Sequence, residues 1–189
     1  GKKLTGIKVI GGDLSGADLK GIVLDGATIM EVKLKGANLG NADLSGTTFN
    51  KSDLSAANLS DADLSGAILE NTIFDNANLS GANLTGLQAK IELVLTKDIS
   101  EMIIPPEIEK IVKENQTDID LSSIDIELED LGFTESDFAD GTCSFAGADL
   151  SGADLNGAEF DKIKLDVVNL SDADLTGVSF RDCSMTHAV

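Results

Sequence analysis

The residues with the most obvious chemical potential form an acidic stretch at 118–140, which holds nine carboxylates and no lysine or arginine. Four of its residues match positions 1, 3, 5 and 12 of an EF-hand calcium-binding loop: Asp118, Asp120, Ser122 and Glu129. Position 6 of such a loop needs glycine for its sharp turn, and this chain has Ser123 there. The pattern therefore does not predict a metal site, and weak divalent-cation binding by the stretch stays open.

Other reactive groups lack partners. The single histidine, His187, has no neighbour in the sequence pattern that would orient it as a base or a metal ligand. The glycines recur at a period of five rather than at a strand-to-helix turn, so they do not predict a phosphate-binding loop. We predict no catalytic residue, no cofactor and no metal, and hence no enzyme.

The elements that carry these residues follow from a repeat. A leucine, or an isoleucine or phenylalanine in its place, returns at every fifth position from Leu14 to Leu84, and an alanine precedes most of them by two. A period of five does not fit a helix of about 3.6 residues per turn. Apolar positions two apart share one side of an extended segment, and the intervening Ser, Gly, Asp and Asn favour turns. Each unit is therefore a short extended piece followed by a corner, and stacked units bury the apolar pairs.

The units read A-D-L-S-G at 42–46, 62–66 and 148–152, and A-N-L-S-G at 77–81. This pattern resembles the pentapeptide-repeat family. The resemblance implies an all-β solenoid, a right-handed quadrilateral β-helix with four units, and therefore twenty residues, per coil. Coils would stack at about 4.8 Å, the usual distance between strands.

The period breaks once, after Leu84, and runs again from Phe145 to Met185. Between these parts lie weak units centred on Leu121, Ile126 and Leu131. We therefore predict one continuous solenoid domain, with a first block at 1–87, a short helical or loop insertion at 88–117 and a second block at 118–189.

Within the insertion, residues 106–115 begin with proline and glutamate and place apolar side chains on one face, which predicts a short amphipathic helix. This helix and the acids that follow it are the predicted interaction surface: Ile108, Ile111, Val112, Asp118, Asp120, Asp125, Glu127, Glu129 and Asp130.

The net charge of −19 is unevenly distributed, with +2 in residues 1–35 and −14 in residues 118–189, which predicts a rod that is strongly acidic at one end. Cys143 and Cys183 both precede a central residue by two and lie two coils apart. That separation of about 10 Å exceeds the limit of about 7 Å between the Cα atoms of a disulfide, so we expect buried free thiols.

These features predict a non-enzymatic protein-interaction scaffold, without identifying the protein partner. The alternative is a DNA mimic, since the resemblance extends to members that protect DNA gyrase and topoisomerase IV, and duplex DNA carries one charge per about 1.7 Å. A type II topoisomerase would then be the partner. Direct binding of nucleic acid is disfavoured by charge repulsion.

No apolar run reaches the length of a membrane span, so we expect a soluble protein, with the cytoplasm favoured. The chain does not begin with Met, so a native N-terminus can lie upstream and the compartment stays open. Open strand edges are normally covered, so we expect either a homodimer through one end of the rod or a further domain that covers this end in a longer protein.

Overall fold

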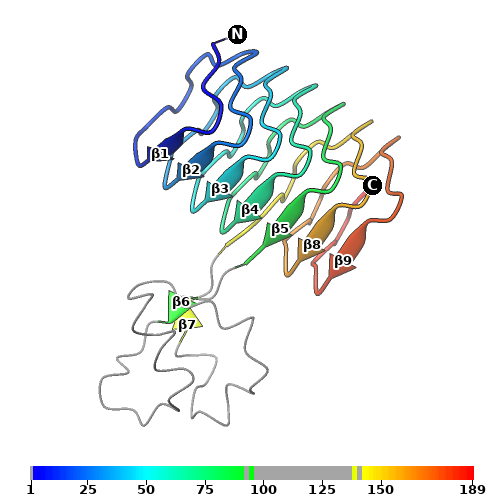
Figure 1. Cartoon of the computed structure of the whole chain (residues 1–189). Helices are drawn as coiled ribbons and strands as arrows, with labels where there is room; N and C mark the ends of the chain where they lie inside the picture. The colour runs from blue at the N-terminus through cyan, green and yellow to red at the C-terminus, as the bar shows by residue number, and fades with distance from the viewer. Residues whose placement is uncertain (1, 92–93, 96–137, 140–141) are drawn as a thin grey trace, which may run out of the picture. The chain divides into compact units, whose positions relative to one another are not determined.

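The computed structural model describes residues 2–91, 94–95, 138–139 and 142–189. Seven short strands form one parallel sheet, stacked in the order β1-β2-β3-β4-β5-β8-β9 (Figure 1). The strands are Lys8–Ile10 (β1), Thr28–Met30 (β2), Thr48–Asn50 (β3), Ile68–Glu70 (β4), Gln88–Lys90 (β5), Glu159–Asp161 (β8) and Ser179–Arg181 (β9). The predicted all-β solenoid is confirmed.

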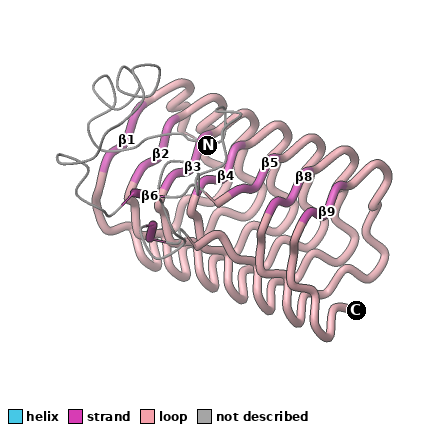
Figure 2. The backbone as a smooth tube through the Cα atoms, turned by 90° about the horizontal axis from the view of Figure 1, so that it is seen from below, coloured by secondary structure: helices cyan, strands magenta, loops and turns pink. Residues whose placement is uncertain are grey.

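Each coil has four walls, and only one of them carries these strands. The other three pair coil to coil through isolated parallel bridges, such as Lys3↔Val23, Asp13↔Lys33 and Asp18↔Asn38. Figure 2 shows the resulting stack of four-sided coils. We name the walls by the central residue of the first unit on each: the Leu4, Val9, Leu14 and Leu19 walls, of which the Val9 wall holds the seven strands.

The interior is filled by the residues of the five-residue period. The central leucines of the inner coils, such as Leu44 and Leu64, are fully buried, and the alanines two positions before them are at most 2% exposed. Phenylalanines form a continuous run through the stack, with successive ring centroids 4.8–6.5 Å apart: Phe49, Phe74, Phe145, Phe160 and Phe180. The core is therefore continuous from the first block into the second.

The polar residues of a unit make its corner. In the unit at 62–66, a carboxylate oxygen of Asp63 accepts a hydrogen bond from the Ser65 amide at 2.9 Å, which closes a local turn. Gly66 then adopts a φ of 63°, in the left-handed region that suits glycine. Some corners place other residues there, including Val167 with a φ of 61°.

The division of the chain differs from the predicted one. Strand β5 pairs directly with β8, with Ala89 opposite Phe160, and Ile73 pairs with Ser144. The solenoid therefore continues to Ile91 and resumes at Thr142, rather than breaking at 87. The boundary was set too early because β5 inverts the usual size order, with a buried leucine at 87 and an alanine in the central position.

Residues 92–141 form a separate compact unit, which we call the inserted segment. Near its two ends, β6 (Val94–Leu95) pairs antiparallel with β7 (Phe138–Ala139). No coil built from 118–140 lies between β5 and β8, since these strands are neighbours in the sheet. Residues 118–137 and the predicted helix at 106–115 lie outside the described residues.

Candidate interaction surface

The outer side of the Leu4 wall changes charge from one end of the stack to the other. The residue preceding each central leucine pairs with its equivalent in the next coil, which aligns these residues in one column. In chain order the column reads Lys3, Val23, Asp43, Asp63, Asn83, Asp154 and Asp174. We call its last five members the acidic column. Neighbours in it are about 4.8 Å apart, as in any parallel pairing.

The carboxylates of the acidic column have structural roles as well as charge. One oxygen of each accepts a hydrogen bond from the amide two residues later, at 3.0 Å for Asp154 and 2.9 Å for Asp174. The hydroxyl and the amide of Thr176 lower the pKa of Asp174 below its usual value, so that this group stays charged. The side-chain amide of Asn83 donates to Asp63 at 3.1 Å and relieves repulsion within the column. The remaining charge faces outward.

The Leu19 wall satisfies its own polar groups. Side-chain amides donate from coil to coil, from Asn58 to Asn38 at 3.1 Å, from Asn78 to Asn58 at 3.3 Å and from Asn169 to Asp149 at 3.0 Å. Such amide ladders stabilise stacked parallel strands. Because the amides are already engaged, this wall is a weaker candidate for binding.

The Val9 wall balances its charges. Lys90 pairs with Glu70 at 3.0 Å, and Arg181 lies 3.9 Å from Asp161, one coil apart in each case. These pairs are partly exposed and contribute little to stability. Among the described residues, the Leu4 wall is therefore the one on which carboxylates follow one another from coil to coil with no lysine or arginine between them in the column.

The Leu14 wall holds the two thiols and the most perturbed carboxylate. Burial raises the pKa of Cys143 to about 12, and the half-buried Cys183 also has a raised pKa, so neither is a reactive thiolate. Both cysteines are free, as predicted, but only Cys143 is fully buried, because Cys183 lies in the last coil. Hydrogen bonds from Ser184 and Thr186 lower the pKa of Asp166 to about 2. The described residues contain no group of three or more His, Cys, Asp or Glu that could hold a metal ion.

Most of the negative charge lies outside the solenoid. Residues 142–189 hold eight acids and three bases, a net charge of −5, and residues 1–91 hold ten acids and eight lysines, a net charge of −2. The inserted segment holds fifteen acids and three lysines, a net charge of −12. The −14 that sequence analysis placed in the second block is therefore mainly a property of the inserted segment.

The predicted site residues all fall in that segment, outside the described residues: Ile108, Ile111, Val112, Asp118, Asp120, Asp125, Glu127, Glu129 and Asp130. The acidic column was missed because the units were compared at a period of five. Comparing every fourth unit would have aligned Asp43, Asp63, Asp154 and Asp174 once the inserted segment was removed.

Comparison with known proteins agrees with the geometry. The sequence profile described as "Pentapeptide repeats" matches this chain, with eight copies in all. The matched ranges are residues 10–46, 29–66, 49–86, 143–182 and 165–189. A search of curated protein sequences found no match. Among the residues that the structure describes, no helix has the length and apolar character needed to cross a membrane.

Three solved structures illustrate the similarity. HetL, a pentapeptide repeat protein involved in heterocyst differentiation regulation from the cyanobacterium Nostoc sp., is 25% identical over 96% of this chain and 67% of its own, with a TM-score of 0.43. QnrB1, a plasmid-mediated fluoroquinolone resistance protein, is 14% identical over 97% and 84%, with a TM-score of 0.42. A pentapeptide repeat protein from the Arabidopsis thaliana thylakoid lumen is 24% identical over 68% and 86%, with a TM-score of 0.31.

Proposed function

Because this chain belongs to the pentapeptide-repeat family, we propose that it is a non-enzymatic protein-interaction scaffold whose partner contacts the inserted segment. One observation carries the proposal: the sheet passes from β5 to β8 without a break. The solenoid therefore does not need residues 92–141 to complete its coils. Segments that a rigid scaffold carries without using them for its own packing commonly carry function.

The composition of the segment indicates the chemistry of its partner. Its net charge of −12 favours a basic protein surface, and opposite charge speeds the encounter of the two proteins. The apolar face predicted for residues 106–115 would supply the less polar centre that protein interfaces usually have. The predicted contact residues are those named above, from Ile108 to Asp130.

The structure shows which residues can be deleted while the five-residue repeat is kept. Removing residues 92–142 and joining Ile91 to Cys143 places Phe145 five positions after Ala89, which restores the repeat. The proposal predicts that wild type captures partner proteins that the deletion variant does not. A second variant with Asp118, Asp120 and Asp125 changed to Asn should capture them less at low salt, and its difference from wild type should shrink as the salt concentration rises. The matched control is Asp43→Asn with Asp63→Asn, which changes the acidic column alone and should capture normally. Equal capture by wild type and the deletion variant contradicts the proposal.

The acidic column supports a second candidate, a DNA mimic that binds gyrase or topoisomerase IV. Against it, the column offers at most one carboxylate per coil, about 4.8 Å apart, whereas duplex DNA carries a charge per about 1.7 Å. The column is also interrupted by Asn83 and begins with Lys3 and Val23. A supercoiling assay with purified gyrase separates the two candidates. Inhibition that survives removal of the inserted segment but is lost in Asp154→Asn with Asp174→Asn would favour the DNA mimic.

A further inference from the structure

The solenoid is assembled from two parts that meet at one coil-to-coil interface. We call residues 2–91 the N-terminal part and residues 142–189 the C-terminal part. Across their interface β5 pairs with β8, and the Phe74 amide donates to the Ser144 carbonyl at 2.6 Å. The ring of Phe74 stacks on that of Phe145, with centroids 4.8 Å apart and an interplanar angle of 5°. The interface therefore has the backbone pairing and the packed core of any two neighbouring coils.

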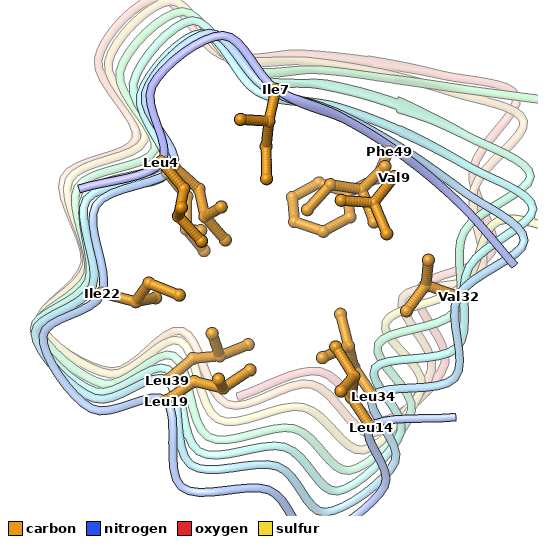
Figure 3. A pocket seen from close by; sticks show the side chains of 13 residues that line it. Leu4, Ile7, Val9, Leu14, Leu19, Ile22, Val32, Leu34, Leu39 and Phe49 are labelled. Carbon is orange, nitrogen blue, oxygen red and sulfur yellow. The ribbon is translucent and has the colours of Figure 1, made fainter. Parts of the chain in front are cut away.

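The connection between the two parts starts and ends at the outside of the solenoid. Figure 3 shows the side chains of Leu14 and Leu34 pointing into the interior, with the backbone running around them. The chain leaves the coil after Ile91, at the corner between the Val9 and Leu14 walls, and re-enters it at Thr142, which is exposed. The connection therefore does not thread the core, and parts from two different copies of the chain can make the same contacts.

Pairing within one chain has a smaller advantage at this interface than elsewhere in the stack. Contacts across the interface join residues 71 positions apart, whereas neighbouring coils within either part join residues 20 positions apart, as in Asp63↔Asn83. The probability of closing a loop falls with about the three-halves power of its length, so closure of the longer loop is about sevenfold less probable. A second copy therefore competes for this interface better than for the others between described coils.

The interface also specifies which coils pair. Lys90 of β5 lies opposite Asp161 of β8, so opposite charges meet there. Docking one coil out of register would bring Lys90 opposite Arg181, or Glu70 opposite Asp161, and would place like charges together. Parts from two copies are therefore directed to the same register as parts of one chain.

Exchange of parts between copies preserves the described contacts. Strand β6 belongs to the chain that supplies the N-terminal part and β7 to the chain that supplies the C-terminal part, so their antiparallel pairing is kept as well. Residues 96–137 then connect the two solenoids, and a chain of that length reaches at most about 140 Å. A stack of seven coils is about 34 Å long. The connection is therefore long enough to join two solenoids.

We propose that this chain forms a domain-swapped dimer, in which the N-terminal part of each copy pairs with the C-terminal part of the other. Each solenoid of the dimer has the contacts of the monomer, so no new interface is needed. Return to the monomer requires a complete coil-to-coil interface to open, so the dimer should persist once it has formed. The dimer also carries two inserted segments, which would raise its avidity for a partner. That consequence rests on the proposed function, whereas the dimer itself does not.

Refolding at different protein concentrations tests the proposal without any partner. Wild type is unfolded in denaturant, refolded and separated by size-exclusion chromatography, and circular dichroism checks that each fraction is folded. The matched control is the deletion variant that joins residue 91 to Cys143, with Ile91→Asn because equivalent corner residues such as Asn71 have a positive φ. Its contacts across the junction return to the ordinary separation of 20 positions. Its corner is a regular one rather than a strained short hinge, so it does not invite swapping.

The dimer-to-monomer ratio of wild type should rise about tenfold for each tenfold increase in concentration during refolding, because closure within one chain does not depend on concentration. The isolated dimer should stay dimeric on dilution and give monomer only after it is unfolded and refolded at low concentration. The deletion variant should remain monomeric throughout. Wild type that refolds only to monomer overturns the proposal. A dimer that dissociates on dilution, or that the deletion variant forms in equal amount, also overturns it.

Discussion

The solenoid and the inserted segment differ in how many acidic residues they carry and in what fixes the positions of those residues. In the coils a carboxylate sits at a fixed position of the unit, where it accepts the amide two residues later, as Asp63 and Asp154 do. The coils carry a net charge of only −7, whereas the much shorter segment carries −12. A coil tolerates an acid because the acid completes a turn. None of the described strands of the stack comes from the segment, so the pairing seen in the stack does not fix its composition.

The strongest test of this comparison is a charge placed inside a coil. Leu64→Asp puts a carboxylate in a position that is fully buried among apolar side chains, and we expect the solenoid to unfold or lose several kcal/mol of stability. The neighbouring surface change Ser65→Lys should be nearly neutral. Ile111→Asp, in the inserted segment, should leave the unfolding transition of the solenoid unchanged and weaken partner capture. Thermal unfolding followed by circular dichroism compares the three variants, and equal stability would contradict the assigned core.

A smaller effect is expected at the corners. Val167 is β-branched, is 61% exposed and has a φ of 61°, a conformation that costs L residues about 1–2 kcal/mol. Val167→Gly should therefore stabilise the solenoid by about 1 kcal/mol, after allowance for the greater freedom of glycine in the unfolded chain. The reverse change at a regular corner, Gly66→Val, should destabilise it by about 1–2 kcal/mol. Chemical denaturation of both variants measures the two effects, and the same sign for both would contradict the argument.

Acids in the coils should also contribute to the pH dependence of stability. The pKa of Asp166 is lowered from 3.8 to about 2 in the folded state, so its stabilising effect is present above the unfolded pKa and is lost as the pH falls from about 4 towards 2. The melting temperature of wild type should exceed that of Asp166→Ala at pH 7. This difference should disappear as the pH falls from about 4 towards 2. Asp118→Ala, in the inserted segment, should show no such gap at any pH.

Deletion of the inserted segment is the largest change to the sequence and should have the smallest effect on the stability of the solenoid. Removing residues 92–142 and joining Ile91 to Cys143 takes away no strand of the seven-stranded sheet and no residue of the phenylalanine run. Ile91 then takes a corner position whose equivalents, including Lys51 and Asn71, have a positive φ, so the deletion variant also carries Ile91→Asn. With that change we expect no loss of solenoid stability and an unchanged β signal in far-ultraviolet circular dichroism. Joining Leu87 to Asp118 instead removes β5 and should destabilise the stack, which makes it the matched control for the position of the junction.

The sequence predicted the solenoid because one physical constraint, a small and a large side chain per five residues, recurs at almost every unit. It failed at β5, where the large and the small residue are exchanged and both Leu87 and Ala89 are buried. It also assigned 119–131 to the coils, since alternating isoleucine and aspartate satisfy the same pattern locally. Only the pairing of Ile73 with Ser144 shows that the coils join elsewhere. The acidic column depends on stacking across coils, which no single unit encodes.

The junction between β5 and β8 also affects the order of folding. Within either block, neighbouring coils pair residues that are 20 positions apart, as in Asp43↔Asp63, whereas contacts across the junction join residues 71 positions apart. Closing the longer loop costs about 1 kcal/mol more in chain entropy. Coils should therefore nucleate separately within 2–91 and within 142–189, and their docking should be the late step of folding.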